Sequence, residues 1–170
     1  MSNTSKGPGT KGSKFWMQYL VKTPQLKAEL DRQLGDILQW ISPLEQENFS
    51  EYELRQPQVY EKLGLDAHGA KSLFSFWPSR QPQWDGIAFG MEGRRLYLVE
   101  AKAHRAELKS SCSASEKSWN IIEAAMKDTI EKEGYKPSDE GLKLWRDGYY
   151  QLANRLTFLS KLQGQLPAVT

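Results

Sequence analysis

The feature that most restricts the fold of this chain is a change of hydrophobic period at residues 84–103. Residues 84–89 (WDGIAF) and 95–103 (RLYLVEAKA) are rich in strand-forming side chains, and the segment between them, GMEGR, contains two glycines. Two such runs joined by a short glycine-containing segment predict a β-hairpin. Helical patterns stand before and after it, so the order of elements predicts one α/β domain in which helices pack against a small sheet.

The hairpin has a predictable register. If its turn is centred between Glu92 and Gly93, facing residues have numbers that add up to 185, and Asp85 faces Glu100. Directly opposed side chains on one sheet face have Cβ atoms about 5 Å apart. The period of two along the second strand puts Lys102 on the same face as Glu100. The sequence therefore predicts two carboxylates and one ammonium group at the end of an otherwise apolar strand pair.

Such a cluster is electrostatically unfavourable unless something neutralises it. Two facing carboxylates repel, and unpaired charges in a partly buried strand cost several kcal/mol. Mg²⁺ binds one or two carboxylates together with waters and phosphate oxygens, so a divalent cation would remove the conflict. Lys102 would then lie where an ammonium group can orient an attacking water and stabilise phosphate charge. The alternative is a structural ion pair between Lys102 and one acid on a solvated sheet face.

The two strings at these positions, WDG at 84–86 and VEAK at 99–102, resemble the motif of the PD-(D/E)XK nuclease superfamily, the fold of restriction endonucleases and Holliday-junction resolvases. The longer string WPSRQPQWDGIAF…LYLVEAKAH is similar to a group of uncharacterised bacterial proteins within that superfamily. The resemblance covers roughly residues 42–160. It implies a restriction-endonuclease-like α/β core, a mixed β-sheet with a central hairpin flanked by helices.

The same resemblance implies a function and its residues. Asp85 and Glu100 would be the metal ligands, with Mg²⁺ as cofactor and Mn²⁺ as its substitute, and Lys102 would be the catalytic lysine. The implied activity is metal-dependent hydrolysis of phosphodiester bonds in DNA. Two alternatives stay open: a non-catalytic DNA-binding or assembly module that retains the fold, and an interaction domain in which the acids and the lysine only pair.

The superfamily commonly adds an acid from the helix that precedes the sheet. Glu51 is the preferred match, with Glu53 and Glu45 as competitors. A solvated helical face is the alternative explanation for all three, and for Glu51 it explains the residue equally well. Side chains expected to contact DNA phosphates bracket the hairpin or lie on the last predicted helix. They are Arg80, Arg94, Arg95, His104, Arg105, Lys109, Gln151 and Arg155. For Gln151 and Arg155 on that helix, an ordinary polar surface residue is the simpler explanation of each taken singly.

The chain departs from the superfamily pattern in two places. The proline that directly precedes the aspartate in the namesake motif stands three residues earlier, at Pro82. The superfamily core also continues with further strands after the helix, whereas residues 165–170 offer one short strand at best. Two expectations stay open: a core that is truncated or reduced at its C-terminus, or a sheet whose open edge is completed by a second copy or a partner chain.

The rest of the chain predicts a basic, disordered tail followed by a single domain over residues 15–170. Leu152, Leu156 and Leu159 belong to the strongest helical stripe, and Ser115 is a predicted helix cap. The predicted segments are a tail at 1–14, helices at 24–41, 49–63, 116–134 and 142–159, and a strand at 71–77.

Composition excludes some classes of protein. No apolar run is long enough to span a membrane, and Gln18 interrupts the apolar patch at 15–21, so we expect neither a membrane span nor a signal peptide. A single cysteine, Cys112, fits a reducing cytoplasm, and with only two histidines a zinc site would need an unusual ligand set. The net charge of +2 does not by itself indicate a nucleic-acid partner.

Overall fold

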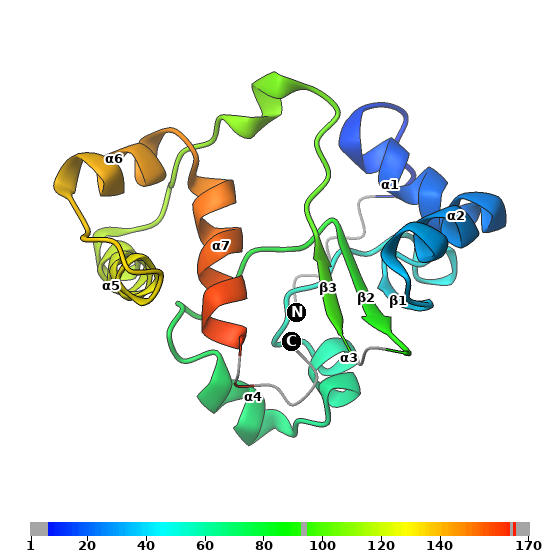
Figure 1. The fold of residues 1–170 in the computed structure, drawn as a ribbon, viewed down its shortest axis with the longest axis horizontal. Coiled ribbons are helices and arrows are strands. Elements are labelled where there is room, and N and C mark those ends of the chain that lie inside the picture. Colours follow the sequence, from blue (N-terminus) through cyan, green and yellow to red (C-terminus); the bar gives the residue numbers. More distant parts are fainter. Residues whose placement is uncertain (1–6, 93–94, 164, 166–170) are drawn as a thin grey trace.

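The computed structural model describes residues 7–92, 95–163 and 165. It shows a mixed α/β fold with a three-stranded antiparallel sheet in the order β1 (Leu38–Ser42), β2 (Gly86–Gly90), β3 (Leu96–Val99). Helices α1 and α2 lie on one side of the sheet and α5, α6 and α7 on the other (Figure 1). The helices are α1 (Gly12–Lys22), α2 (Pro24–Leu34), α3 (Pro57–Tyr60), α4 (Ala67–Leu73), α5 (Glu116–Lys132), α6 (Asp139–Asp147) and α7 (Tyr150–Leu162), with 3-10 turns η1 (Glu45–Glu47), η2 (Glu61–Leu63) and η3 (Arg105–Leu108).

The predicted hairpin and its register are confirmed. Gly86 pairs with Val99 and Phe89 pairs with Leu96, so the paired numbers add up to 185. The strands are shorter than expected, because β3 ends at Val99. The expected mixed sheet is wrong for the described strands, since both strand pairs are antiparallel.

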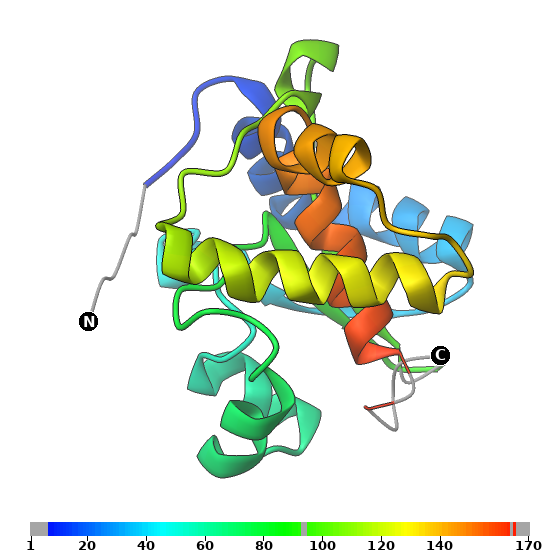
Figure 2. The same ribbon diagram turned by 90° about the vertical axis from the view of Figure 1, so that its left-hand side faces the viewer.

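The two faces of the sheet pack into separate apolar clusters. Ile87 is fully buried in the larger one, together with Trp84 and with Phe158 of α7. The smaller cluster lies on the α1 side, where Met17 packs near Val99. Figure 2 shows α5 crossing α7 on the outer side, so α7 lies between α5 and the sheet.

The predicted helix at 24–41 is wrong beyond Leu34. Gly35 ends α2 in the left-handed region at φ 63°, a conformation that favours glycine. The chain then forms β1, which pairs with β2 from Leu38 opposite Gly90 to Ser42 opposite Ile87. Ile41 is 3% exposed in the larger cluster. Tertiary pairing with the hairpin therefore overrides the helical spacing of the leucines and isoleucines in this stretch.

The predicted strand at 71–77 is also wrong, because its first residues belong to α4. The Asp66 carboxylate accepts a hydrogen bond from the Gly69 N–H at 2.7 Å, which caps this helix. Ala70 and Phe74, four residues apart, are both buried in the core. Of the predicted helix at 49–63, only residues 57–63 are helical. The earlier part is not helical: it contains turns at Phe49 and at residues 54–55, and Tyr52 forms a β-bridge to Trp84.

The helix after Ser115 is confirmed as α5, with the Ser115 hydroxyl accepting from the Ser118 N–H. The single helix predicted at 142–159 is wrong, because the chain breaks between α6 and α7. There the Ser110 N–H donates to the Gly148 carbonyl at 2.9 Å, and the Tyr150 N–H donates to the Ser110 carbonyl at 3.1 Å. The break changes the helical phase, so α7 buries Phe158 and leaves its own part of the predicted apolar stripe exposed. That part is Leu152, Leu156 and Leu159, whereas Leu142, the first residue of the stripe, is buried on α6.

The predicted tail at 1–14 is too long. Helix α1 begins at Gly12, and the Gly9 N–H already donates to the Gln18 side chain at 2.7 Å. Residues 1–6 of the predicted tail lie outside the described residues. No helix within the described ranges has the length and apolar character needed to cross a membrane.

Candidate active site

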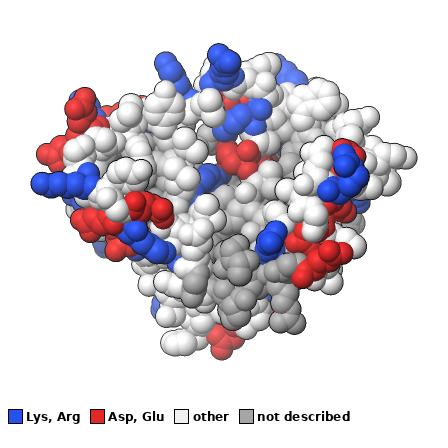
Figure 3. Space-filling view, in the orientation of Figure 1, with Lys and Arg blue, Asp and Glu red and all other residues white. Residues whose placement is uncertain are grey.

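Three acidic residues meet where the hairpin strands end. Asp85 and Glu100 each stand one residue beyond the last strand pair, Gly86 with Val99. The Asp85 carboxylate accepts a hydrogen bond from the Ala101 N–H at 2.8 Å. This side chain therefore continues the hydrogen bonding between the two strands beyond their last backbone pair. Acidic atoms are visible at the bottom of a hollow on the face drawn in Figure 3, over the end of β3.

The third acid reaches Asp85 through a separate strand pairing. Tyr52 and Trp84 form an antiparallel bridge, in which the Trp84 N–H donates to the Tyr52 carbonyl at 3.1 Å. The residues on either side of an antiparallel bridge face one another, so Glu51 is opposite Asp85. Asp85 therefore lies between Glu51 on one neighbouring segment and Glu100 on the other. We call Glu51, Asp85, Glu100 and Lys102 the acid–lysine cluster.

The protonation of Asp85 reflects this position. Burial and then the negative charge of Glu100 raise the pKa of Asp85 from 3.8 to about 6, and Glu51 adds to the rise. The hydrogen bond from Ala101 and the charge of Lys102 act in the opposite direction, but they do not outweigh burial. Asp85 is thus a carboxylate whose negative charge is poorly compensated by the protein alone.

Glu100, in contrast, is neutralised from two sides. One of its oxygens accepts from the Lys102 ammonium group, and the other accepts from Arg155 Nε at 2.8 Å. The three side chains are between 12% and 20% exposed, so these ion pairs are shielded from solvent and are stronger than surface pairs. Gln151 completes the arrangement by accepting from Lys102 at 3.0 Å.

Arg155, one of the residues predicted to contact DNA, is paired with Glu100 in the structure. Its guanidinium also donates to the Gln83 carbonyl at 2.7 Å and lies 4.3 Å from the centre of the Trp84 ring. These contacts fix α7 over the end of the hairpin. Sequence periodicity offers no signal for a pairing of Arg155 with Glu100, because 55 residues separate them.

The structure separates the three candidates for the additional acid. Glu45 is paired with Lys22 at 2.7 Å, and Glu53 accepts from the Gln81 N–H at 3.2 Å. Of these candidates, only Glu51 is opposite Asp85. The expectation that it comes from a helix is wrong, because Glu51 lies in the extended segment before Tyr52.

The predicted DNA-contacting residues divide by position. Arg80 is exposed on the loop before β2, and His104, Arg105 and Lys109 are exposed in and around η3, beyond β3. Figure 3 shows Lys and Arg side chains along the upper rim of the hollow, over η3 and α1. Arg95 is exposed at the opposite end of the hairpin, roughly 17 Å along the strand from Glu100. Arg94 lies outside the described residues.

Helix α1 borders the cluster, a contact that the prediction of a tail over residues 1–14 missed. An added Cβ at Gly86 would lie 2.7 Å from Met17 Cε and 3.0 Å from Trp40 Cζ3, so glycine permits the close packing of α1 next to Asp85. The residues around the small space beside Asp85 are Lys14, Met17, Gln18, Pro43 and Glu51.

Among the described residues, the cluster supplies carboxylates, the ligand type that a hard divalent cation prefers, but not a complete ligand set. Carboxylate oxygens are the ligands that Mg²⁺ prefers, and the under-compensated Asp85 is the strongest candidate among them. Within the described residues, no three carboxylate, histidine or cysteine side chains gather closely enough to hold a metal ion. Glu100 is the second candidate ligand, and Lys102, which already donates to Gln151 at 3.0 Å, would have to release it.

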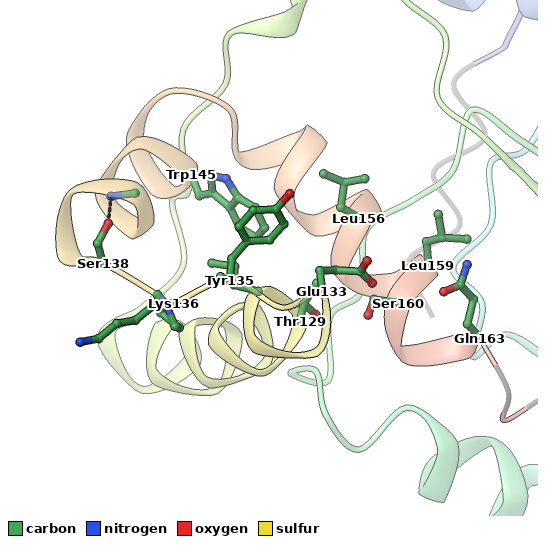
Figure 4. A pocket seen from close by; sticks show the side chains of 13 residues that line it. Thr129, Glu133, Tyr135, Lys136, Ser138, Trp145, Leu156, Leu159, Ser160 and Gln163 are labelled. Atoms are coloured by element: carbon green, nitrogen blue, oxygen red, sulfur yellow. Dashed lines mark hydrogen bonds between the residues drawn. The ribbon is translucent and has the colours of Figure 1, made fainter.

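A second hollow, a groove of about 490 Å³, lies between α5, α6 and α7. Figure 4 shows Leu156 and Leu159 of α7 at one side of it and Tyr135 and Trp145 at the other. Its lining is mainly apolar and includes none of the residues of the acid–lysine cluster, so it is not part of the candidate active site.

Comparison with protein-family models, with curated proteins and with solved structures finds no match to this chain. Its function is therefore inferred from the acid–lysine cluster and its contacts.

Proposed function

We propose that this protein hydrolyses phosphodiester bonds in DNA with the help of Mg²⁺, or Mn²⁺ as its substitute. The observation that carries the proposal is the convergence of Asp85, Glu100 and Lys102 at one end of the hairpin. The same three residues carry the resemblance to the PD-(D/E)XK superfamily, and we propose its restriction-endonuclease-like core for this chain. The supporting pattern is one aspartate followed by Glu-X-Lys on the facing strand of a hairpin that is flanked by helices.

The proposed roles follow from the contacts. Asp85 and Glu100 would hold the cation, with Glu51 as a third acid beside Asp85. When bound, the cation supplies positive charge that polarises a phosphate and lowers the pKa of a water. Lys102 would leave Glu100 and place its ammonium group beside the reacting phosphate, where Gln151 continues to orient it. Arg155 would keep Glu100 in place from the other side.

A non-catalytic DNA-binding or assembly module is the second candidate, and one observation favours it. Both oxygens of Glu100 are already engaged by Lys102 and Arg155, which leaves Glu100 less available to a metal ion. Such a module would keep the fold and the basic rim around the hollow while lacking turnover.

The deciding experiment compares wild type and Lys102→Ala on plasmid, branched and single-stranded DNA with Mn²⁺. We expect wild type to cut at least one substrate and Lys102→Ala to lose cutting while keeping its fold and most of its DNA affinity. Lys127→Ala, which changes a half-exposed lysine on α5 that is likewise paired with a glutamate, is the matched control and should cut normally. If wild type binds tightly but cuts nothing, the non-catalytic module replaces the enzyme. If it neither binds nor cuts, the cluster is a structural ion network.

A further inference from the structure

Helix α1 combines two features that the proposed chemistry does not use. Its sequence, GSKFWMQYLVK, holds lysines and aromatic residues but no aspartate or glutamate. Its buried face consists of Met17, Gln18 and Val21, which anchor it against the sheet beside Asp85. The packing of this face therefore holds α1 beside Asp85 and leaves Trp16 and Tyr19 exposed.

The aromatic residues form a cluster of their own on the outside of α1. Trp16 is 59% exposed and Tyr19 48% exposed. The Phe15 and Tyr19 rings are stacked, with centroids 6.0 Å apart and an angle of 11°, and Trp16 packs edge-on to Phe15 at 5.2 Å. Single exposed apolar residues are common, but two exposed aromatic rings in contact with a third, partly buried one indicate an interaction surface. We call Phe15, Trp16 and Tyr19 the aromatic face.

The charge around the aromatic face decides which kind of partner it suits. Lys11 is exposed just before the helix, and Lys14, next to Phe15 in sequence, lines the space beside Asp85. A helix with lysines and without acids attracts a polyanion. Proteins that bind single-stranded nucleic acid combine basic side chains for the phosphates with aromatic rings on which unpaired bases stack.

Duplex DNA does not use such a surface. In a duplex each base face is covered by the neighbouring base, so duplex DNA can contact this surface only through its phosphates. Exposed rings beside a basic patch therefore favour DNA with unpaired bases over continuous duplex. A protein partner would find no acidic residue on α1 to pair with its own cations.

We infer that the aromatic face stacks unpaired bases, so that the DNA presented to the acid–lysine cluster is single-stranded or carries an unpaired strand. As a statement about the substrate, this inference rests on the proposed function. As a statement about binding, it can be tested without any cleavage.

The test measures the affinity of the full chain for a labelled single strand of about 15 nucleotides and for a duplex of the same sequence, by fluorescence anisotropy in EDTA. Trp16→Ala with Tyr19→Ala should weaken single-strand binding by roughly 5- to 150-fold, the usual effect of losing base stacking, and leave duplex binding unchanged. Trp16→Phe should retain most of the affinity, since a smaller ring still stacks. Tyr135→Ala, which removes a ring that is 73% exposed elsewhere on the surface, is the matched control and should change nothing.

Three results would overturn the inference: no single-strand binding by wild type, unchanged affinity in the double variant, or equal weakening of single-strand and duplex binding. The Mn²⁺ cleavage assay keeps this failure distinct from failure of the proposed function. Binding that depends on Trp16 without cleavage would refute the nuclease and support the aromatic face. Cleavage that is indifferent to Trp16 and Tyr19 would support the nuclease and refute the aromatic face.

Discussion

Replacing Asp85 by asparagine should stabilise the metal-free protein near neutral pH. Asparagine has almost the same shape, and its amide oxygen can still accept the hydrogen bond from Ala101. What it removes is a negative charge held in a half-buried site between Glu51 and Glu100. Most substitutions at a buried polar position destabilise a protein, so a gain in stability is a specific expectation.

The size of the effect follows from the pKa of Asp85, which burial and Glu100 raise from 3.8 to about 6. The folded protein then holds the proton more tightly than the unfolded chain does. Ionised Asp85 therefore destabilises the folded state above pH 6, and this penalty shrinks as the pH falls toward 3.8. At 1.36 kcal/mol per pKa unit the full penalty is about 3 kcal/mol, an upper limit because Asp85 is only partly buried.

Urea unfolding followed by tryptophan fluorescence in EDTA measures this directly. Asp85→Asn should raise the free energy of unfolding by about 1–3 kcal/mol at pH 7.5, and the advantage should disappear near pH 4. Asp147→Asn, which changes an aspartate with a 55% exposed side chain, should shift stability by less than about 0.5 kcal/mol at either pH. A destabilised Asp85→Asn variant at pH 7.5, or a difference that does not depend on pH, would refute the argument.

Three further predictions concern the metal, the lysine and assembly. Millimolar Mn²⁺ should raise the melting temperature of wild type by several degrees, because only the folded state holds the acids together, and Asp85→Asn should reduce that rise; an unchanged wild-type curve would count against a metal site. Lys102→Arg should not rescue the cleavage lost in Lys102→Ala, since a guanidinium is bulkier and stays protonated near neutral pH, and recovered nicking would contradict a specific ammonium role. Light scattering at tens of micromolar protein should show a homodimer or larger complex, because a three-stranded sheet leaves edges and Leu152, Leu156 and Leu159 are exposed on α7; a stable monomer would refute it.

The register of the hairpin could be predicted, although its strand ends could not, because the signals for the register are local. Alternating side chains and a glycine-containing turn determine the register, and Asp85, Glu100 and Lys102 then follow from counting. Helix α5 was predictable for the same reason, since its cap and its buried stripe lie within one segment.

The errors arose where distant contacts decide the structure. Residues 38–42 form a strand because β2 pairs with them. In the helix predicted at 49–63, helical structure begins only at residue 57, because Tyr52 pairs with Trp84 instead. The buried face of α7 is set by the break at Gly148, where the chain pairs with Ser110. None of these partners can be identified from the periodicity of the segment itself.

The acid–lysine cluster shows the same division. Its hairpin members were predicted from spacing, whereas the clamp of Arg155 on Glu100 and the packing of α1 beside Asp85 depend on residues far away in sequence. Glu51, the preferred additional acid, lies opposite Asp85, but the helix on which it was predicted does not form at that position.

The most direct test of the proposed metal site is a crystal structure of the protein soaked with Mn²⁺, with anomalous diffraction to locate the ion. We predict an anomalous peak between Asp85 and Glu100, with the Lys102 ammonium group displaced from the Glu100 carboxylate. An unchanged contact of Glu100 with Lys102 and Arg155, and no peak at the Asp85 carboxylate in a crystal soaked at millimolar Mn²⁺, would contradict the metal-dependent mechanism.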